Sequence, residues 1–151
     1  MTTTDERLKE LGIELPDPIQ PAGSYVRYYR TGNLLFISGT GPTDRSPKGK
    51  VGAEVSLDDA RQAARDVGLQ ILATAKEALD GDLDRIIHAV KVLGMVNTAP
   101  DFLDHPKVIN GCSDVLVEVL GERGRHTRSA IGFAALPHDI CVEIEATFEV
   151  K

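Results

Sequence analysis

The sequence predicts an α+β domain in which two helices cover one face of a mixed β-sheet. Two long segments repeat apolar residues at helical spacing. Five short segments are rich in β-branched and aromatic residues or alternate apolar with polar ones, and the order along the chain is ββαβαββ. With 151 residues and no internal repeats, the chain has the size of one domain with one core.

An extension is expected before this domain. It begins with a short amphipathic helix that has Leu8 and Leu11 on one side and Gly12 at its end. The connector over residues 16–21 contains three prolines, which cannot continue a helix. We therefore expect residues 1–21 to fold back as a helix and a Pro-rich connector over a main domain of residues 22–151.

Two strands joined by a tight turn are expected at the start of the main domain. Residues 25–29 and 34–38 are strand-like, and Gly32 and Asn33 between them suit the positive φ angles of a hairpin turn. The next segment, residues 39–52, contains two prolines and four glycines. We expect it to be an exposed, mobile loop.

Both long helices carry signals at their ends. Ser56 lies three residues before Asp59, a spacing that caps the start of a helix, and Gly81 marks the end of that helix. Its apolar stripe is rich in alanine, which indicates close packing on the sheet. The second helix is expected at residues 105–120, where Gly121 follows it.

The remaining strands are expected at residues 86–96, 129–135 and 140–150. In the first of these, Val90, Val92 and Val96 should share one face. The other face has Lys91, Leu93 and Met95, so it is also partly apolar. Since two helices cover only one face of the sheet, we expect another copy of the chain to cover the other face.

Composition and charge exclude several classes of function. The formal net charge of −6 and the 5% of aromatic residues argue against nucleic-acid binding. No apolar run is long enough to span a bilayer, and the N-terminus does not resemble a secretory signal, so a cytoplasmic location is expected. Cys112 and Cys141 are expected to be small apolar core residues.

Arg128 is the first candidate for chemistry, because it follows a glycine-containing loop at the start of a strand. A guanidinium there could bind a carboxylate with two parallel hydrogen bonds. A solvated or structurally ion-paired arginine would show the same pattern. Glu143 and Glu145 lie on one side of the last strand and could pair with Arg128 or hold a water, or could form a solvated strand face.

Other kinds of site have no support in the sequence. The four histidines share no metal-binding spacing, and only His126, two residues before Arg128, is close to a candidate residue. No glycine-rich phosphate loop and no nucleophile elbow is present. We therefore expect neither a metal nor a cofactor.

Several segments, taken in their order and spacing, resemble the RidA (YjgF) family. The resemblance covers roughly residues 22 to 150 and has its most specific part in an Arg-Ser pair followed fifteen residues later by Glu-Ile-Glu. The segments are Tyr25, Ile37–Gly39, Gly81–Arg85, Asn97, Asp101-Phe102, Asn110, Arg128-Ser129, Leu136-Pro137 and Val142–Ala146.

The resemblance implies a chorismate-mutase-like fold of the bacillary type and a homotrimer with clefts between its subunits. Founding members hydrolyse reactive 2-imino acids, such as 2-iminopropanoate and 2-iminobutanoate, to 2-keto acids and ammonia, which removes damaging metabolites. By this resemblance Arg128 would bind the substrate carboxylate and Glu143 would position the attacking water. The remaining residues lining the cleft would be Tyr25, Ser38, Gly39 and Asn110.

Departures from the founding members point to a side branch of the family. Ala130 stands where they carry cysteine, Thr40 stands where they carry glutamine, and the N-terminal extension is additional. Two other functions stay open at this point. The chain could bind a small carboxylate, such as a keto acid, without turnover, or it could be an endoribonuclease, against which its acidic charge and few aromatics count.

Overall fold

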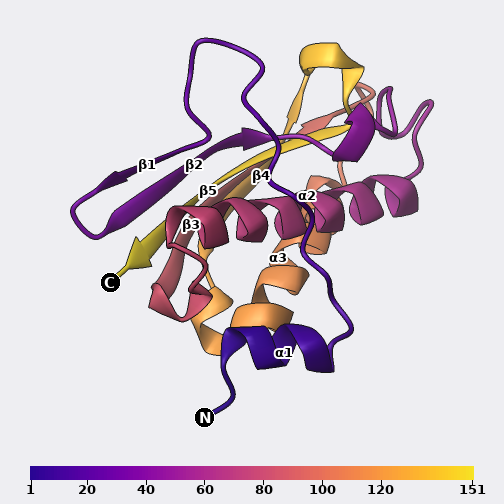
Figure 1. Cartoon of the computed structure of the whole chain (residues 1–151). Helices are drawn as coiled ribbons and strands as arrows, with labels where there is room; N and C mark the ends of the chain where they lie inside the picture. Colours follow the sequence, from indigo (N-terminus) through magenta and orange to yellow (C-terminus); the bar gives the residue numbers. More distant parts are fainter.

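The computed structural model describes all 151 residues as one mixed sheet covered by helices on one face (Figure 1). The five strands lie in the order β1-β2-β5-β3-β4, and only β3 and β4 are parallel. The strands are β1 (Tyr28–Thr31), β2 (Leu34–Thr40), β3 (Ile86–Asn97), β4 (Thr127–Phe133) and β5 (Val142–Val150). The helices are α1 (Thr4–Glu10), α2 (Leu57–Ala78) and α3 (His105–Leu120).

The predicted α+β fold and the ββαβαββ order of the main domain are confirmed. Two strands are shifted in position: β1 begins at Tyr28 instead of Tyr25, and β4 spans Thr127–Phe133 instead of residues 129–135. Thr31 pairs with Leu34 across a two-residue turn in which Gly32 has φ +58°. That turn fixes the register, so the paired strand lies closer to the turn than the aromatic residues alone suggested.

Strand alternation places the core between the sheet and the helices. On β5, Ile144 and Phe148 are fully buried, whereas Glu143 and Glu145 point to the opposite face. On β3 the predicted face needs a correction. Val92 and Val96 are buried, but Val90 is 37% exposed because the pairing of β3 with β5 shifts between Ala89 and Lys91.

Helix α2 starts as predicted, since the Ser56 hydroxyl accepts a hydrogen bond from the Asp59 backbone N–H at 3.1 Å. Its closest neighbour is helix α3. A Cβ added at Gly111 of α3 would lie 2.0 Å from the backbone oxygen of Arg61 on α2. The two helices therefore touch backbone to backbone, and glycine is required at that contact.

The N-terminal helix packs against the lower end of the domain (Figure 1). Thr3 and Glu6 form a reciprocal capping box at its start, and Leu8 belongs to the hydrophobic core. The Thr4 hydroxyl donates a hydrogen bond to the Asp84 carboxylate at 2.5 Å. None of the helices in the protein is both long and apolar enough to cross a membrane.

The segment of residues 39–52 is more ordered than a mobile loop, which corrects the prediction. Val51 is fully buried and its backbone N–H donates to the Asn97 carbonyl at 2.7 Å. The buried Asn97 amide in turn donates to the backbone oxygens of Gly49 and Ile140. These bonds attach the loop to the ends of β3 and β5, so its shape is set by partners distant in sequence.

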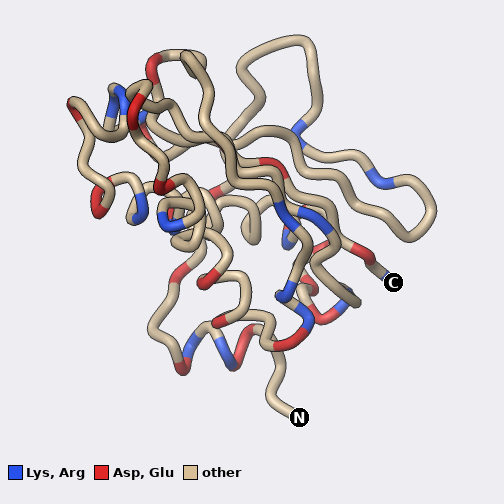
Figure 2. The backbone as a smooth tube through the Cα atoms, turned by 180° about the vertical axis from the view of Figure 1, so that it is seen from behind, with Lys and Arg blue, Asp and Glu red and all other residues tan.

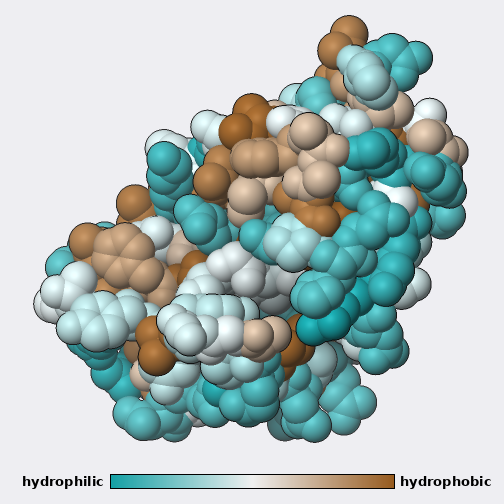
Figure 3. Space-filling model, turned by 90° about the horizontal axis from the view of Figure 1, so that it is seen from above, coloured by the Kyte–Doolittle hydropathy of each residue, from teal (hydrophilic) through white to brown (hydrophobic).

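The face of the sheet without helices carries apolar side chains in the open. On this face Phe36 is 43% and Ile131 is 44% exposed, and their neighbours include Tyr29, Leu93, Met95 and Phe133. Seen from above, hydrophobic side chains lie exposed among hydrophilic ones (Figure 3). Lys and Arg positions occur among Asp and Glu positions along the backbone (Figure 2).

Candidate functional site

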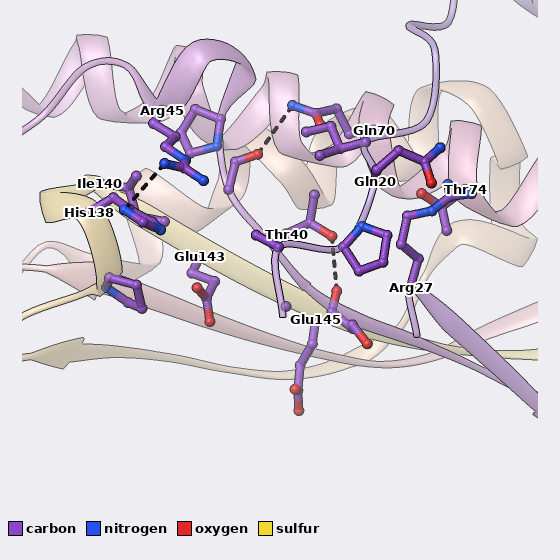
Figure 4. A pocket seen from close by; sticks show the side chains of 18 of the residues that line it. Gln20, Arg27, Thr40, Arg45, Gln70, Thr74, His138, Ile140, Glu143 and Glu145 are labelled. Atoms are coloured by element: carbon purple, nitrogen blue, oxygen red, sulfur yellow. Dashed lines mark hydrogen bonds between the residues drawn. The ribbon is translucent and has the colours of Figure 1, made fainter. Parts of the chain in front are cut away.

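A cavity of about 580 Å³ brings together four of the residues predicted for the site (Figure 4). It lies where β2 ends and β5 begins, between the connector of residues 19–22 and the short turn of residues 137–139. Of its 19 lining residues, the predicted ones are Tyr25, Ser38, Gly39 and Glu143.

Glu143 is the central acid of this cavity. It lies on β5 with its carboxylate against the backbone of Gly39, where an added Cβ would stand 2.7 Å from Oε2. Gly39 therefore gives the carboxylate its room. Burial, and secondarily the negative charge of Glu145, raise the pKa of Glu143 above its usual value near 4.5. A carboxyl with a raised pKa can accept and return a proton closer to neutral pH.

Ser38 and Tyr25 form part of the wall beside this acid. The Ser38 hydroxyl donates to the Val26 carbonyl at 2.6 Å and so ties β2 to the segment before β1. The Tyr25 hydroxyl accepts a hydrogen bond from the Ala22 backbone N–H at 3.3 Å. Tyr25 is half exposed, so its ring lies at the edge of the cavity.

Arg128 and Asn110, the other two predicted site residues, lie outside this cavity. Arg128 is on β4 and pairs with Val92, which is buried beneath the helices. Glu143 pairs with Met95 on the opposite face of the sheet. Directly paired residues point to one face, so within one chain Arg128 and Glu143 project from opposite faces of the sheet and are separated by β3.

Two groups of α3 hold the Arg128 side chain. Its Nη1 donates to the Ser113 hydroxyl at 3.0 Å, and its Nη2 donates to the Pro106 carbonyl at 3.3 Å. The Ser113 hydroxyl also lies 2.9 Å from Nε2 of His126, whose Nδ1 lies 2.7 Å from the Gly124 carbonyl. Since Nδ1 can only donate to a carbonyl, Nε2 of the neutral ring accepts the hydroxyl proton of Ser113.

Burial, with a smaller contribution from the charge of Arg128, lowers the pKa of His126 below its usual value. The ring is therefore neutral at physiological pH and fixes the direction of the Ser113 hydroxyl. The sequence marked His126 only by its closeness to Arg128. Ser113 was missed, because its contact with Arg128 depends on how α3 packs beside β4.

Arg128 has no carboxylate partner within its own chain. The ion pairs of the protein all involve other residues, so the sequence-based pairing of Arg128 with Glu143 or Glu145 is wrong for one chain. Two of its five N–H groups are used by Ser113 and Pro106. The other N–H groups and the positive charge have no side-chain partner within the chain.

The cavity also contains polar residues that the sequence did not single out. Arg45 lies at one end, with its Nη1 3.3 Å from Nδ1 of His138, and both residues have positive φ angles. Arg27 and Gln70 line the other end. No local pattern could have revealed them, since they converge only when the loop of residues 39–52 and helix α2 meet β2.

Neither a metal site nor a reactive thiol is indicated by the arrangement of side chains. No group of three or more His, Cys, Asp or Glu residues is placed to hold a metal ion. Burial raises the pKa of Cys112 to about 12 and that of Cys141 to about 11, so both thiols stay protonated. They are free, buried core residues, as predicted.

The fold and the cavity define a class of small α+β proteins with a polar, acid-containing cleft beside an open sheet face. Residues 5–145 match the family described as "YjgF/chorismate mutase-like, putative endoribonuclease". The chain therefore belongs to the YjgF/chorismate-mutase-like family, and the predicted resemblance is confirmed. The family assignment extends over most of the chain, including part of the N-terminal segment.

Known relatives share nearly the full length of the chain. Protein TCP17 of Trypanosoma cruzi is 40% identical over 148 residues, which cover 95% of this chain and 92% of that protein. The crystal structure of Atu1372 from Agrobacterium tumefaciens, a protein of unknown function, is 41% identical with a TM-score of 0.88, over 98% and 92% of the two chains. A "putative endoribonuclease" from Shewanella oneidensis is 30% identical with a TM-score of 0.92, over 98% and 99%.

Proposed function

We propose that this protein hydrolyses reactive 2-imino acids to 2-keto acids and ammonia in clefts between its copies. The main observation in support is that one chain contains two incomplete halves of a site. Arg128 is a fixed cation without a carboxylate partner, and Glu143 is an acid in a cavity with a raised pKa. The two groups are on opposite faces of the sheet, so the proposal combines Arg128 of one copy with Glu143 of another.

A homotrimer is the proposed assembly, in line with the family resemblance. The open face of the sheet exposes Phe36, Ile131 and Phe133, each more than a third accessible in a single chain. Covering such apolar surface with another copy is favourable by about 25 cal/mol per Å² removed from water. A cyclic arrangement lets β4 of one copy approach the cavity of the next, so that one copy supplies Arg128 and its neighbour supplies Glu143.

In the proposed reaction Arg128 binds the substrate carboxylate and orients the C=N bond. Glu143 holds a water molecule and takes one of its protons as the water oxygen bonds to C2. That proton passes to the imine nitrogen, which leaves a hydroxyl and an amine on C2. Glu143 then takes the hydroxyl proton as the C=O bond forms and gives it to the amine nitrogen, so that the C–N bond breaks and neutral ammonia leaves the 2-keto acid. Imines react readily with water, so holding the two reactants in position supplies most of the needed acceleration.

The other predicted residues have supporting parts in this proposal. Gly39 leaves room for the Glu143 carboxylate, and Ser38 fixes the wall beside it. Tyr25 borders the cavity, and Asn110 is half-buried on α3, on the same helix face as Pro106 and Ser113, which hold Arg128. An amide at that position could donate to or accept from the substrate next to the guanidinium.

The direct test compares release of keto acid from freshly generated 2-iminopropanoate by the wild type, Arg128→Ala and Glu143→Gln. Each variant should lose roughly a hundredfold or more of the rate, since each removes one of the two positioned groups. Arg125→Ala, which changes an exposed arginine three residues away, is the matched control and should keep the full rate. A wild type no faster than the uncatalysed reaction would refute the proposal.

Mixing the two inactive variants tests whether a cleft takes residues from two copies. If trimers are dissociated and reassembled from equal amounts of Arg128→Ala and Glu143→Gln chains, about one quarter of the clefts should contain both intact residues. The activity should therefore recover to about that fraction. If trimers that are shown to be mixed recover no activity, the two residues either act within one chain or do not share a site.

The same wild-type and variant proteins also test the two alternative functions. A binding protein without turnover would be stabilised thermally by 2-oxobutanoate in the wild type but not in Arg128→Ala, with no imine hydrolysis. An endoribonuclease would cleave RNA in an Arg128-dependent way. The net charge of −6 and the dispersed basic residues give that activity little electrostatic support.

A further inference from the structure

The cavity extends well beyond the Glu143 carboxylate. Its volume of about 580 Å³ lies in the range of pockets that enclose much larger ligands than an imino acid of three or four carbons. Only 4 of its 19 lining residues are hydrophobic, whereas most small-molecule sites are lined mainly by apolar side chains. The surplus space is therefore suited to a polar part of a substrate.

Gln70 presents an unused acceptor at the end of the cavity away from Arg45 (Figure 4). The side chain lies on α2 and is only 1% exposed. Its Nε2 is fixed by the Gly41 carbonyl at 3.2 Å, the Thr43 hydroxyl at 3.1 Å and the Asp66 carboxylate at 3.0 Å. These three acceptors determine the amide orientation, and Oε1 is buried without a hydrogen-bond partner.

Arg27 presents an unused donor at the same end, next to Gln20 and Thr74 (Figure 4). Its Nη2 pairs with the Glu77 carboxylate, and its Nη1 is buried without a partner. A buried donor or acceptor without a partner costs about 1–3 kcal/mol. Two such atoms at one end of a polar cavity are an exception to the usual satisfaction of buried groups, and a bound ligand can supply both partners.

We infer that this end of the cavity is a subsite for the substrate's side chain, and that it prefers a neutral polar group with a donor for Gln70 and an acceptor for Arg27. A terminal carboxamide fits this description. The inference rests on the proposed function, because it assigns the side chain of the imino acid hydrolysed at Glu143.

Other side chains fit this end less well. A carboxylate would meet the Gln70 oxygen, with Arg27 already neutralised by Glu77, and a cation would meet Arg27. An apolar side chain would leave both buried atoms without partners. A site built to hydrogen-bond its substrate rejects an apolar analogue of equal size much more strongly than an apolar pocket rejects a polar one.

The test uses the 2-imino acids formed from asparagine and leucine by an amino-acid oxidase, since the two side chains have the same shape. The wild type should hydrolyse the asparagine-derived imine with a kcat/KM at least tenfold higher. Gln70→Met and Arg27→Met should each bring the ratio close to one, chiefly by lowering kcat/KM for the asparagine-derived imine. Arg30→Met, at an exposed arginine of β1 outside the cavity, should leave the ratio unchanged.

Equal rates on the two imines in the wild type, or a preference that survives in folded variants, would overturn the subsite. If the wild type hydrolyses neither imine, the proposed function fails, and calorimetric binding of 2-oxosuccinamate against 4-methyl-2-oxopentanoate then decides the subsite by itself. Tighter binding of the amide that is lost in the variants supports it, and equal binding refutes it. Thermal melting shows whether each variant is folded. If only one of the two variants folds, that variant is sufficient for the test.

Discussion

The half of the site around Glu143 and the half around Arg128 differ in charge and in the elements that hold them. The Glu143 half is a cavity built mostly from loops and the ends of β2 and β5. The Arg128 half is an open edge, where one strand and one helix fix a single cation by hydrogen bonds to Ser113 and Pro106. A base with a raised pKa and a guanidinium without a carboxylate partner are complementary, and in the proposed reaction neither half acts alone.

Different residues keep Glu143 and Arg128 in position. Glu143 depends on an empty volume, because Gly39 has no side chain to fill it. Arg128 depends on the position of α3, which is set by backbone contact with α2 at Gly111. Substitutions at Gly39 or on α3 should therefore affect one half of the site and leave the other unchanged, which experiments can test.

The largest effect is expected from Gly111→Ala. The new methyl group would overlap the backbone oxygen of Arg61, so α2 and α3 must move apart, at a cost of roughly 2 kcal/mol or more in the free energy of unfolding. Denaturant unfolding measures it. Asp114→Ala, also on α3, removes an exposed ion pair with Arg61 of α2; it is the control and should change stability by less than about 0.5 kcal/mol. An unchanged midpoint for Gly111→Ala would mean that the helices are not in backbone contact.

Gly39→Ala should impair the Glu143 half with little loss of stability. The added methyl group meets the end of a flexible side chain, so the Glu143 carboxylate can move aside, but it then no longer holds water in place. We expect imine hydrolysis to fall by about 10²-fold, with binding of 2-oxobutanoate retained. A variant with the wild-type rate would show that the carboxylate position is unimportant.

Ser113→Ala should weaken the Arg128 half. It removes a hydrogen bond that fixes the guanidinium, and we expect KM for the imino acid to rise by about tenfold while kcat changes little. Ser113→Thr, which keeps the hydroxyl, should restore most of the affinity. If alanine and threonine behave alike, the hydroxyl does not position Arg128.

The smallest effect is a shift in pH dependence. The Glu145 charge contributes to the raised pKa of Glu143, so Glu145→Gln should lower that pKa. The reactive form of Glu143 is deprotonated, and the acid limb of kcat/KM should accordingly move to lower pH in the variant. Burial, the larger cause of the raised pKa, is left in place, so the limb should stay above that of an ordinary glutamate.

Local sequence patterns were sufficient for most of the fold. The Ser56 cap, the turn at Gly32-Asn33 and the alternation along β5 involve residues within a few positions of one another, and each is present. In the turn, however, only Gly32 has the predicted positive φ, and Asn33 does not. The errors in the strands concern how one strand pairs with another. The start of β1 and the exposed Val90 both depend on register, which the sequence of a single strand does not specify.

The sequence by itself determined the α+β architecture, the family, and the residue types that could bind a carboxylate or hold a water. Those properties follow from periodicity, turn chemistry and the order of motifs. Only the tertiary structure decided that Arg128 and Glu143 project from opposite faces of the sheet, that Ser113 and His126 support the arginine, and that Arg27 and Gln70 line the cavity. The physical reason is that such contacts arise from packing between segments far apart in the chain, where no local pattern reports them.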